Sequence, residues 1–198
     1  MKKKILSIIT ILLMFVMLIT LTGCGNESKK DEEETASSPK EVVEEFLGYV
    51  EEGKFSKASK LIDWTLAYKV DDENYYSYED YDFEALEDMP SKEIKEYKND
   101  NEDDIEYFKN YFESYETDVD DMASFKININ LEDDEKVDGT KNIYLVEAEV
   151  EMNWKIEKDD DEETSTETIE FYIMKDDGEY KIIDGITDIR YMLADMTW

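Results

Sequence analysis

The chain has 198 residues, of which 54 are Asp or Glu and 22 are Lys or Arg, so its formal charge at pH 7 is −32. This surplus of acid excludes ordinary binding to the phosphate backbone of nucleic acids, which needs clustered Lys and Arg. With no histidine and a single cysteine, the chain also cannot form a histidine-based triad, the usual zinc sites or an internal disulfide.

The first 23 residues have the features of a secretory signal. Three lysines follow Met1, and residues 5–22 contain no charged side chain, which is the order of a basic region and an apolar region in such signals. An apolar run of this length is also long enough for an uncleaved membrane-spanning anchor. The end of the run favours the signal.

Leu21-Thr22-Gly23-Cys24 resembles the lipobox of bacterial lipoproteins. The resemblance implies that a diacylglyceryl group is attached to Cys24, that the chain is cut after Gly23, and that the protein is exported and anchored to the outer face of the cell membrane. Two acyl chains are enough for stable anchoring. The cut removes three lysines and no acid, so the charge changes from −32 to −35.

Residues 24–38 are predicted to be the lipidated cysteine and a flexible tether, because this stretch has no large apolar residue and is rich in Ser, Glu and Lys. Residues 39–198 have the length of a single domain. A helix is predicted to begin at Pro39, with Ser38 as its cap, and to end near Gly53. A shorter helix, over residues 55–62, is predicted to follow.

The second half of the chain has the alternating pattern of half-buried strands. Strands are predicted over residues 125–131, 144–156, 169–173 and 180–183, with a hairpin turn at Asp176-Asp177-Gly178 and a last short helix over 189–198. Together with the first helices, they predict an α+β fold in which N-terminal helices pack on a curved antiparallel meander sheet.

Residues 71–121 contain 21 acidic residues, four lysines and eight of the 14 tyrosines. Ile105, Phe108, Phe112 and Tyr115 have helical spacing, so a helix is predicted over roughly 103–116, while 74–83 is predicted to be a loop. Tyrosines offer rigid contact area and acids attract cations. The segment is therefore our candidate for binding a cationic protein or peptide, through Tyr75, Tyr76, Tyr78 and Tyr81. The alternative is that these tyrosines are core and the acids only give solubility.

Residues 38–63 and 178–186 resemble the first two helices and the last strand of the nuclear-transport-factor-like superfamily, also called cystatin-like or SnoaL-like. The resemblance implies a cone of helices and sheet whose interior serves catalysis, small-ligand binding or packing alone. It covers about half of the domain, and the acidic middle segment departs from it. Trp64, Trp154 and Phe171 are candidates for lining such a pocket, the alternative being that they are core.

No cofactor or metal is predicted. The loop at 133–139 resembles a calcium loop, but the EF-hand pattern would place Lys136 and Leu145 at positions that need oxygen ligands. The sequence thus predicts a membrane-anchored extracytoplasmic lipoprotein that binds a protein, peptide or envelope component, in an accessory or immunity role. The alternative is a small-ligand carrier or an enzyme that uses an Asp and a Tyr in the cavity of the cone.

Overall fold

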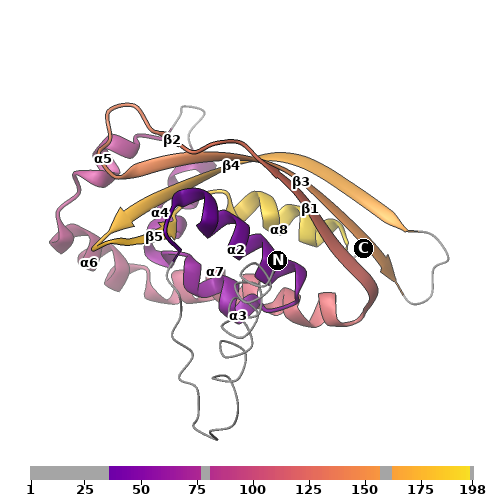
Figure 1. The fold of residues 1–198 in the computed structure, drawn as a ribbon. Coiled ribbons are helices and arrows are strands. Elements are labelled where there is room, and N and C mark those ends of the chain that lie inside the picture. The colour runs from indigo at the N-terminus through magenta and orange to yellow at the C-terminus, as the bar shows by residue number, and fades with distance from the viewer. Residues whose placement is uncertain (1–35, 77–80, 157–161, 197–198) are drawn as a thin grey trace, which may run out of the picture. The chain divides into compact units, whose positions relative to one another are not determined.

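The computed structural model describes residues 36–76, 81–156 and 162–196, except for the side chains of 74–76. Thr35–Trp198 form one compact unit, in which helices come first, an antiparallel sheet follows and a helix ends the order. Figure 1 shows the sheet curving over helices that lie on its concave side. The predicted α+β fold is confirmed, and the curled sheet fits a cystatin-like arrangement.

Helix α2 (Pro39–Glu51) begins at the residue that the sequence predicts. The Ser38 hydroxyl accepts a hydrogen bond from the backbone N–H of Glu41 (3.2 Å), which satisfies one of the free donors of the first turn. The Glu41 carboxylate in turn accepts from the backbone N–H (2.8 Å) and the hydroxyl (2.6 Å) of Ser37. The predicted second helix is α3 (Phe55–Ala58), continued by the 3-10 helix η1 (Ser59–Leu61).

The sheet is a meander of four main strands in the order β1-β3-β4-β5, with antiparallel neighbours. The strands are β1 (Met122–Leu131), β3 (Ile143–Ile156), β4 (Glu163–Asp176) and β5 (Glu179–Ile182), and the short β2 (Glu135–Lys136), which the sequence did not predict, pairs with β3. Between β4 and β5, Asp177 (φ 47°) and Gly178 (φ 92°) both adopt the left-handed conformation of a tight hairpin turn.

The middle of the chain is more helical than predicted. It forms α4 (Trp64–Tyr76), α5 (Phe83–Glu87), α6 (Ser91–Asp100) and α7 (Glu102–Asp120). The loop predicted over 74–83 is wrong at its two ends, because α4 extends to Tyr76 and α5 begins at Phe83. The Asp63 carboxylate starts α4 by accepting hydrogen bonds from the N–H groups of Thr65 (3.0 Å) and Leu66 (3.1 Å). This capping residue was not recognised in the sequence.

The described residues form two apolar clusters. The large cluster lies between the sheet and helices α2, α3, α7 and α8 (Ile186–Asp195), where the Phe112 ring packs against Phe46 (centroids 5.9 Å apart), Phe55 (5.3 Å) and Trp64 (5.6 Å). The small cluster consists of Leu66, Val70, Phe83, Leu86, Ile143 and Ile183, with partly buried residues against it.

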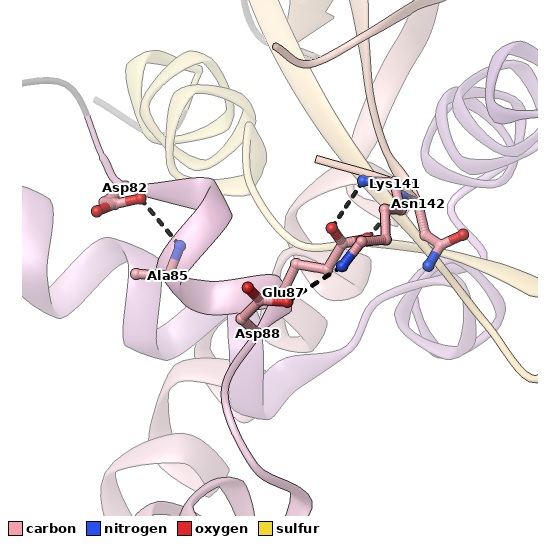
Figure 2. Close-up of polar contacts among 6 residues, drawn as sticks. All are labelled: Asp82, Ala85, Glu87, Asp88, Lys141 and Asn142. Atoms are coloured by element: carbon pink, nitrogen blue, oxygen red, sulfur yellow. Dashed lines mark hydrogen bonds and ion pairs between the residues drawn. The ribbon is translucent and has the colours of Figure 1, made fainter. Parts of the chain in front are cut away.

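Polar contacts hold α5 against the loop between β2 and β3. The Glu87 carboxylate accepts hydrogen bonds from the backbone N–H groups of Lys141 (2.7 Å) and Asn142 (2.6 Å), and the Lys141 ammonium is 3.3 Å from a carboxylate oxygen of Asp88 (Figure 2). At the other end of α5, Asp82 caps the helix by accepting from the N–H of Ala85 (2.9 Å). These bonds fix one wall of the small cluster.

Candidate partner-binding surfaces

Helix α7 presents three different sides. Its apolar side is buried and consists of Ile105, Phe108, Phe112, Tyr115 and Val119, of which all but Ile105 belong to the large cluster. A second side, which includes Glu102, Glu106 and Lys109, borders a surface cavity. The third side carries Tyr107, which is 71% exposed, and Tyr111, which is 39% exposed.

We call Tyr107 and Tyr111 of α7, with Arg190 and its chain neighbour Tyr191 of α8, the tyrosine face. The three tyrosines of α7 are four residues apart, so they succeed one another along the helix. The rings of Tyr107 and Tyr111 are nearly parallel, with centroids 6.2 Å apart, and Tyr111 meets Tyr115 edge to face at 5.5 Å. The Tyr115 hydroxyl is 3.2 Å from the Tyr111 hydroxyl and 3.4 Å from the Arg190 carbonyl oxygen.

Arg190 is the only arginine of the chain, and it joins α8 to α7. Its guanidinium carbon is 4.6 Å from the ring centre of Phe108 and 4.7 Å from that of Tyr111, which are favourable cation–π distances. Within the described residues it forms no ion pair, and its buried Nε has no acceptor. In an acid-rich chain, this guanidinium therefore orders an aromatic surface instead of neutralising a carboxylate.

Next to Arg190 on α8, Tyr191 is 65% exposed and borders a cavity of about 240 Å³ between α8 and β4. Glu167, Asp188 and Asp195 also line this cavity. Burial raises the pKa of Asp188, and the negative charge of Glu167 raises it further. The tyrosine face thus has acidic neighbours on its α8 side.

A second group of acids surrounds the start of α8. Burial raises the pKa of Asp184 to about 6, and the charges of Asp188, Asp71 and Glu170 add to the shift, against the hydrogen bond from the Gly185 N–H (2.7 Å). Gly185 has a φ of 91°, and a Cβ there would lie 2.9 Å from the carbonyl oxygen of Glu170. The start of α8 is therefore packed closely on β4. Asp184 lines neither the cavity between α8 and β4 nor the cavities beside Trp64 and the β4–β5 hairpin.

A cavity of about 730 Å³ lies between α4, α6 and the β4–β5 hairpin, and we call it the hairpin groove. Its apolar lining belongs to the small cluster and consists of Leu66, Met89, Ile94, Met174 and Ile183. Helix α6 is attached to α4 through Tyr97, whose ring is 6.4 Å from that of Tyr68 and 4.8 Å from the Lys69 ammonium. No residue of α6 is buried.

A neighbouring cavity of about 480 Å³, the Trp64 cavity, shares Asp63 and Lys181 with the hairpin groove. The indole N–H of Trp64 donates to the carbonyl and hydroxyl oxygens of Ser59, both at 3.0 Å, which fixes the ring in this wall. The other two pocket candidates from the sequence lie in the core. Trp154 is 4% exposed and Phe171 is fully buried, and neither lines any of the three cavities.

Most of the other predicted site residues lie outside the described part of the chain. This applies to Cys24 and Tyr78 and to the side chains of Tyr75 and Tyr76. Tyr81 is described. Its ring is half-buried against Phe83, with centroids 5.1 Å apart, and burial raises its pKa.

The exposed tyrosines differ from the four predicted to bind a partner. Tyr107 and Tyr111 lie within the predicted segment 71–121, and Tyr191 lies outside it. The apolar spacing that predicted the helix over 103–116 also puts Tyr107 and Tyr111 away from the core side, so this part of the tyrosine face could have been found. No pattern in the sequence indicates that Arg190 packs on their helix. Among the residues that the structure describes, no group of three or more His, Cys, Asp or Glu could hold a metal ion, and no helix is long and apolar enough to cross a membrane.

Comparison with models of protein families, with curated proteins and with solved structures finds no match to this chain. Because fold alone does not determine function, the surfaces of the domain are what indicate it.

Proposed function

We propose that this protein is exported, anchored through lipid on Cys24 to the outer face of the cell membrane, and binds a cationic protein or peptide there through its acidic domain. The lipobox-like sequence supports the anchoring. A charge of −35 after removal of residues 1–23 supports a cationic partner, because opposite charges speed encounter and exclude acidic competitors. An accessory or immunity role fits a domain held near the membrane by a tether.

The observation that carries the binding proposal is the tyrosine face. Tyr107 and Tyr191 expose most of their surface, and tyrosine and arginine are the residue types that dominate binding energy at protein interfaces. The Arg190 guanidinium lies against the Tyr111 ring, so less side-chain entropy is lost when a partner binds. Acids lie beside the face, because Asp188 and Asp195 line the same cavity as Tyr191.

The space under the sheet also favours a binding surface over an interior site. Phe46, Phe55, Phe112 and Phe171 are fully buried there. Phe46 contacts both Phe112 and Phe171, at centroid distances of 5.9 and 6.0 Å. Aromatic side chains thus fill the region in which a cone of this type would hold a ligand, and the described cavities lie at its borders.

The binding proposal is tested with the lipid-free domain and partners captured from envelope extracts. The triple variant Tyr107→Ser, Tyr111→Ser, Tyr191→Ser is expected to raise the dissociation rate about 10-fold or more, if each ring contributes as interface tyrosines do. The matched control is Ile129→Ser with Ile156→Ser, which removes two other exposed apolar side chains, 39% and 38% exposed. Equal rates for the triple variant and the wild type would exclude the tyrosine face.

The anchoring proposal is tested separately with Cys24→Ala. Metabolic labelling with a fatty acid is expected to mark the wild-type protein and not the variant, which should be left uncleaved or released. Unchanged label in the variant would contradict lipidation at Cys24.

A second candidate function is a small-ligand carrier or an enzyme that uses an Asp and a Tyr. The observation in its favour is the size of the hairpin groove and the Trp64 cavity, about 730 and 480 Å³, which is within the range of small-molecule sites. It predicts that a metabolite extract protects the domain against thermal unfolding. Turnover of such a metabolite would favour the enzyme.

A further inference from the structure

The hairpin groove combines an apolar floor with an acidic rim. Its charged lining consists of the acids Asp63, Glu87, Asp176, Asp177 and Glu179 and the bases Lys95 and Lys181. Lys181 is already engaged, because its ammonium donates to the carbonyl oxygen of Lys60 (2.7 Å) and is 3.7 Å from the Glu179 carboxylate. The groove thus offers a surplus of carboxylates, and Asp176, Asp177 and Glu179 are exposed on the β4–β5 hairpin.

The floor of this groove is incompletely covered by the described chain. Met89, Ile94 and Met174 pack against the small cluster but remain partly exposed, and α6 has no buried residue. Helix α2, by contrast, buries Val42, Val43, Phe46, Leu47 and Val50 almost completely. An apolar occupant of the groove would supply contacts that α6 lacks, and Met side chains adapt readily to partners of different shape.

We infer that the hairpin groove binds a cationic amphipathic peptide segment. Its apolar side chains would lie on Met89, Ile94 and Met174, and its Lys or Arg side chains would pair with the carboxylates of the hairpin. Basic amphipathic segments are recognised in this way, by an apolar groove with charges of opposite sign around it. The inference rests on the proposed function, from which it takes a cationic peptide as the class of partner. It places binding in the hairpin groove and not on the tyrosine face.

The charge of the rim argues against other occupants of similar size. An anion would be repelled by Asp176, Asp177 and Glu179, and a neutral apolar molecule would offer no counter-charge to Asp176 and Asp177, which unlike Glu179 have no ion pair among the described residues. A peptide that carries both apolar and basic groups satisfies the floor and the rim together, since charge complementarity then adds to apolar burial.

The test uses residues 36–198, because this part contains all the residues of both apolar clusters and so holds its own core. The probe is a synthetic Leu/Lys peptide whose leucines follow one side of a helix. A peptide of the same composition with scrambled order, which has no apolar side, is the control. Binding is measured by calorimetry at low and high salt, and the fold of each variant is checked by circular dichroism.

Two groups of variants distinguish the contribution of the apolar floor to peptide binding from that of the acidic rim. The rim variant is Asp176→Asn, Asp177→Asn, Glu179→Gln, in which Asn at 177 suits the left-handed backbone (φ 47°). Its matched control, Glu132→Gln, Asp134→Asn, Glu149→Gln, removes the same charge from exposed sites that do not line the groove. The floor variants are Ile94→Ser and Met174→Ser, made singly and together.

We expect the rim variant to weaken binding of the patterned peptide about 10-fold at low salt. The combined floor variant should weaken it about 10-fold at both salt concentrations. The control variant should change it less than either, and the scrambled peptide should bind more weakly than the patterned one. Equal effects of the rim variant and its control would mean diffuse attraction by the whole domain and would overturn the inference, as would unchanged binding by the floor variants.

The tyrosine-face variant of the previous section distinguishes this inference from the proposed function. If it weakens peptide binding and the groove variants do not, the groove is excluded and the tyrosine face is supported. If only the groove variants weaken binding, the groove is supported and the peptide does not use the tyrosine face. Absence of binding by the wild-type domain would overturn the groove inference, while capture of envelope partners still decides the proposed function.

Discussion

The two apolar clusters differ in how completely the chain closes them. In the large cluster, Phe46, Phe112 and Phe171 are fully buried, and the sheet covers one side while helices cover the other. In the small cluster, Met89, Ile94 and Met174 remain partly exposed beside a cavity of about 730 Å³. The same domain therefore contains one core that is complete and one that is open.

The cause of the difference is the amount of apolar sequence that each element contributes. Helix α2 has five apolar residues on one side, and all are buried. Helix α6, in contrast, offers only Ile94 and Tyr97 among charged and small polar residues. Because apolar burial supplies most of the stability of a domain, we expect the region around α6 to open more easily than the region under the sheet. Binding surfaces are commonly found in such less stable regions.

The largest expected effect is on the large cluster. Phe112→Ala removes a ring that packs on three aromatic neighbours, so it should lower the free energy of unfolding by about 3–5 kcal/mol. Chemical denaturation measures this loss. Asn110→Ala, at an exposed position of the same helix, is the control and should change the free energy by less than about 0.5 kcal/mol. A small loss for Phe112→Ala would mean that the large cluster is not closed.

This contrast also explains which parts of the fold the sequence could predict. Strand β3 repeats an apolar residue at every second position, and Val146, Ala148, Val150, Met152 and Trp154 are buried as expected. Ile129, also expected to be buried, is 39% exposed on the edge strand β1. An alternating pattern thus predicts which side of a strand is apolar, but not how far neighbouring elements cover it.

The helices of the middle segment were harder to predict, because many of their residues are charged or are tyrosines that suit core and surface equally well. The single helix predicted over roughly 103–116 corresponds to α7, whereas α6, which ends at Asp100 just before α7 begins at Glu102, was not predicted as a separate helix. The tyrosine face could be predicted only in part. Tyr107 and Tyr111 follow from the spacing of α7, but Arg190 comes from a distant helix whose packing no local pattern indicates.

The second prediction concerns the ionisable group at the start of α8. The pKa of Asp184 is raised from 3.8 to about 6 in the folded domain, so the folded state binds its proton more tightly than the unfolded state does. The resulting stabilisation is complete below pH 3.8 and is lost as the pH rises through about 6. Asp184→Asn keeps an oxygen to accept the Gly185 N–H and should make the domain about 3 kcal/mol more stable at pH 7.

The measurement is the free energy of unfolding between pH 4 and 8 for the wild type and for Asp184→Asn. The difference between the two should shrink as the pH falls below 6, which separates Asp184 from the many other acids of the domain. Asp176→Asn, at an exposed site, is the control and should follow the wild type. A constant difference at all pH values would contradict a titration of Asp184 near 6.

The third prediction tests whether the small cluster is open. Ile94 is partly buried beside the hairpin groove, and Ile and Ser have similar helix propensities, so Ile94→Ser should lower the free energy of unfolding by only about 1 kcal/mol. Thermal or chemical unfolding checks this, with Lys95→Ser as the control at the next, exposed position. A loss as large as that of Phe112→Ala would mean that Ile94 is core and that the groove is closed in solution.

The smallest effect on stability is expected at the tyrosine face. Tyr107 is 71% exposed, and tyrosine and serine have similar helix propensities, so Tyr107→Ser should change the free energy of unfolding by less than about 0.5 kcal/mol. Tyr111→Ser should cost more, about 1 kcal/mol, because it also removes the ring on which the Arg190 guanidinium lies. Denaturant unfolding of the two single variants compares them directly. If Tyr107→Ser destabilised the domain as much as Tyr111→Ser, the Tyr107 ring would be part of the packing between α7 and α8. It could then not serve as a contact that is free for a partner.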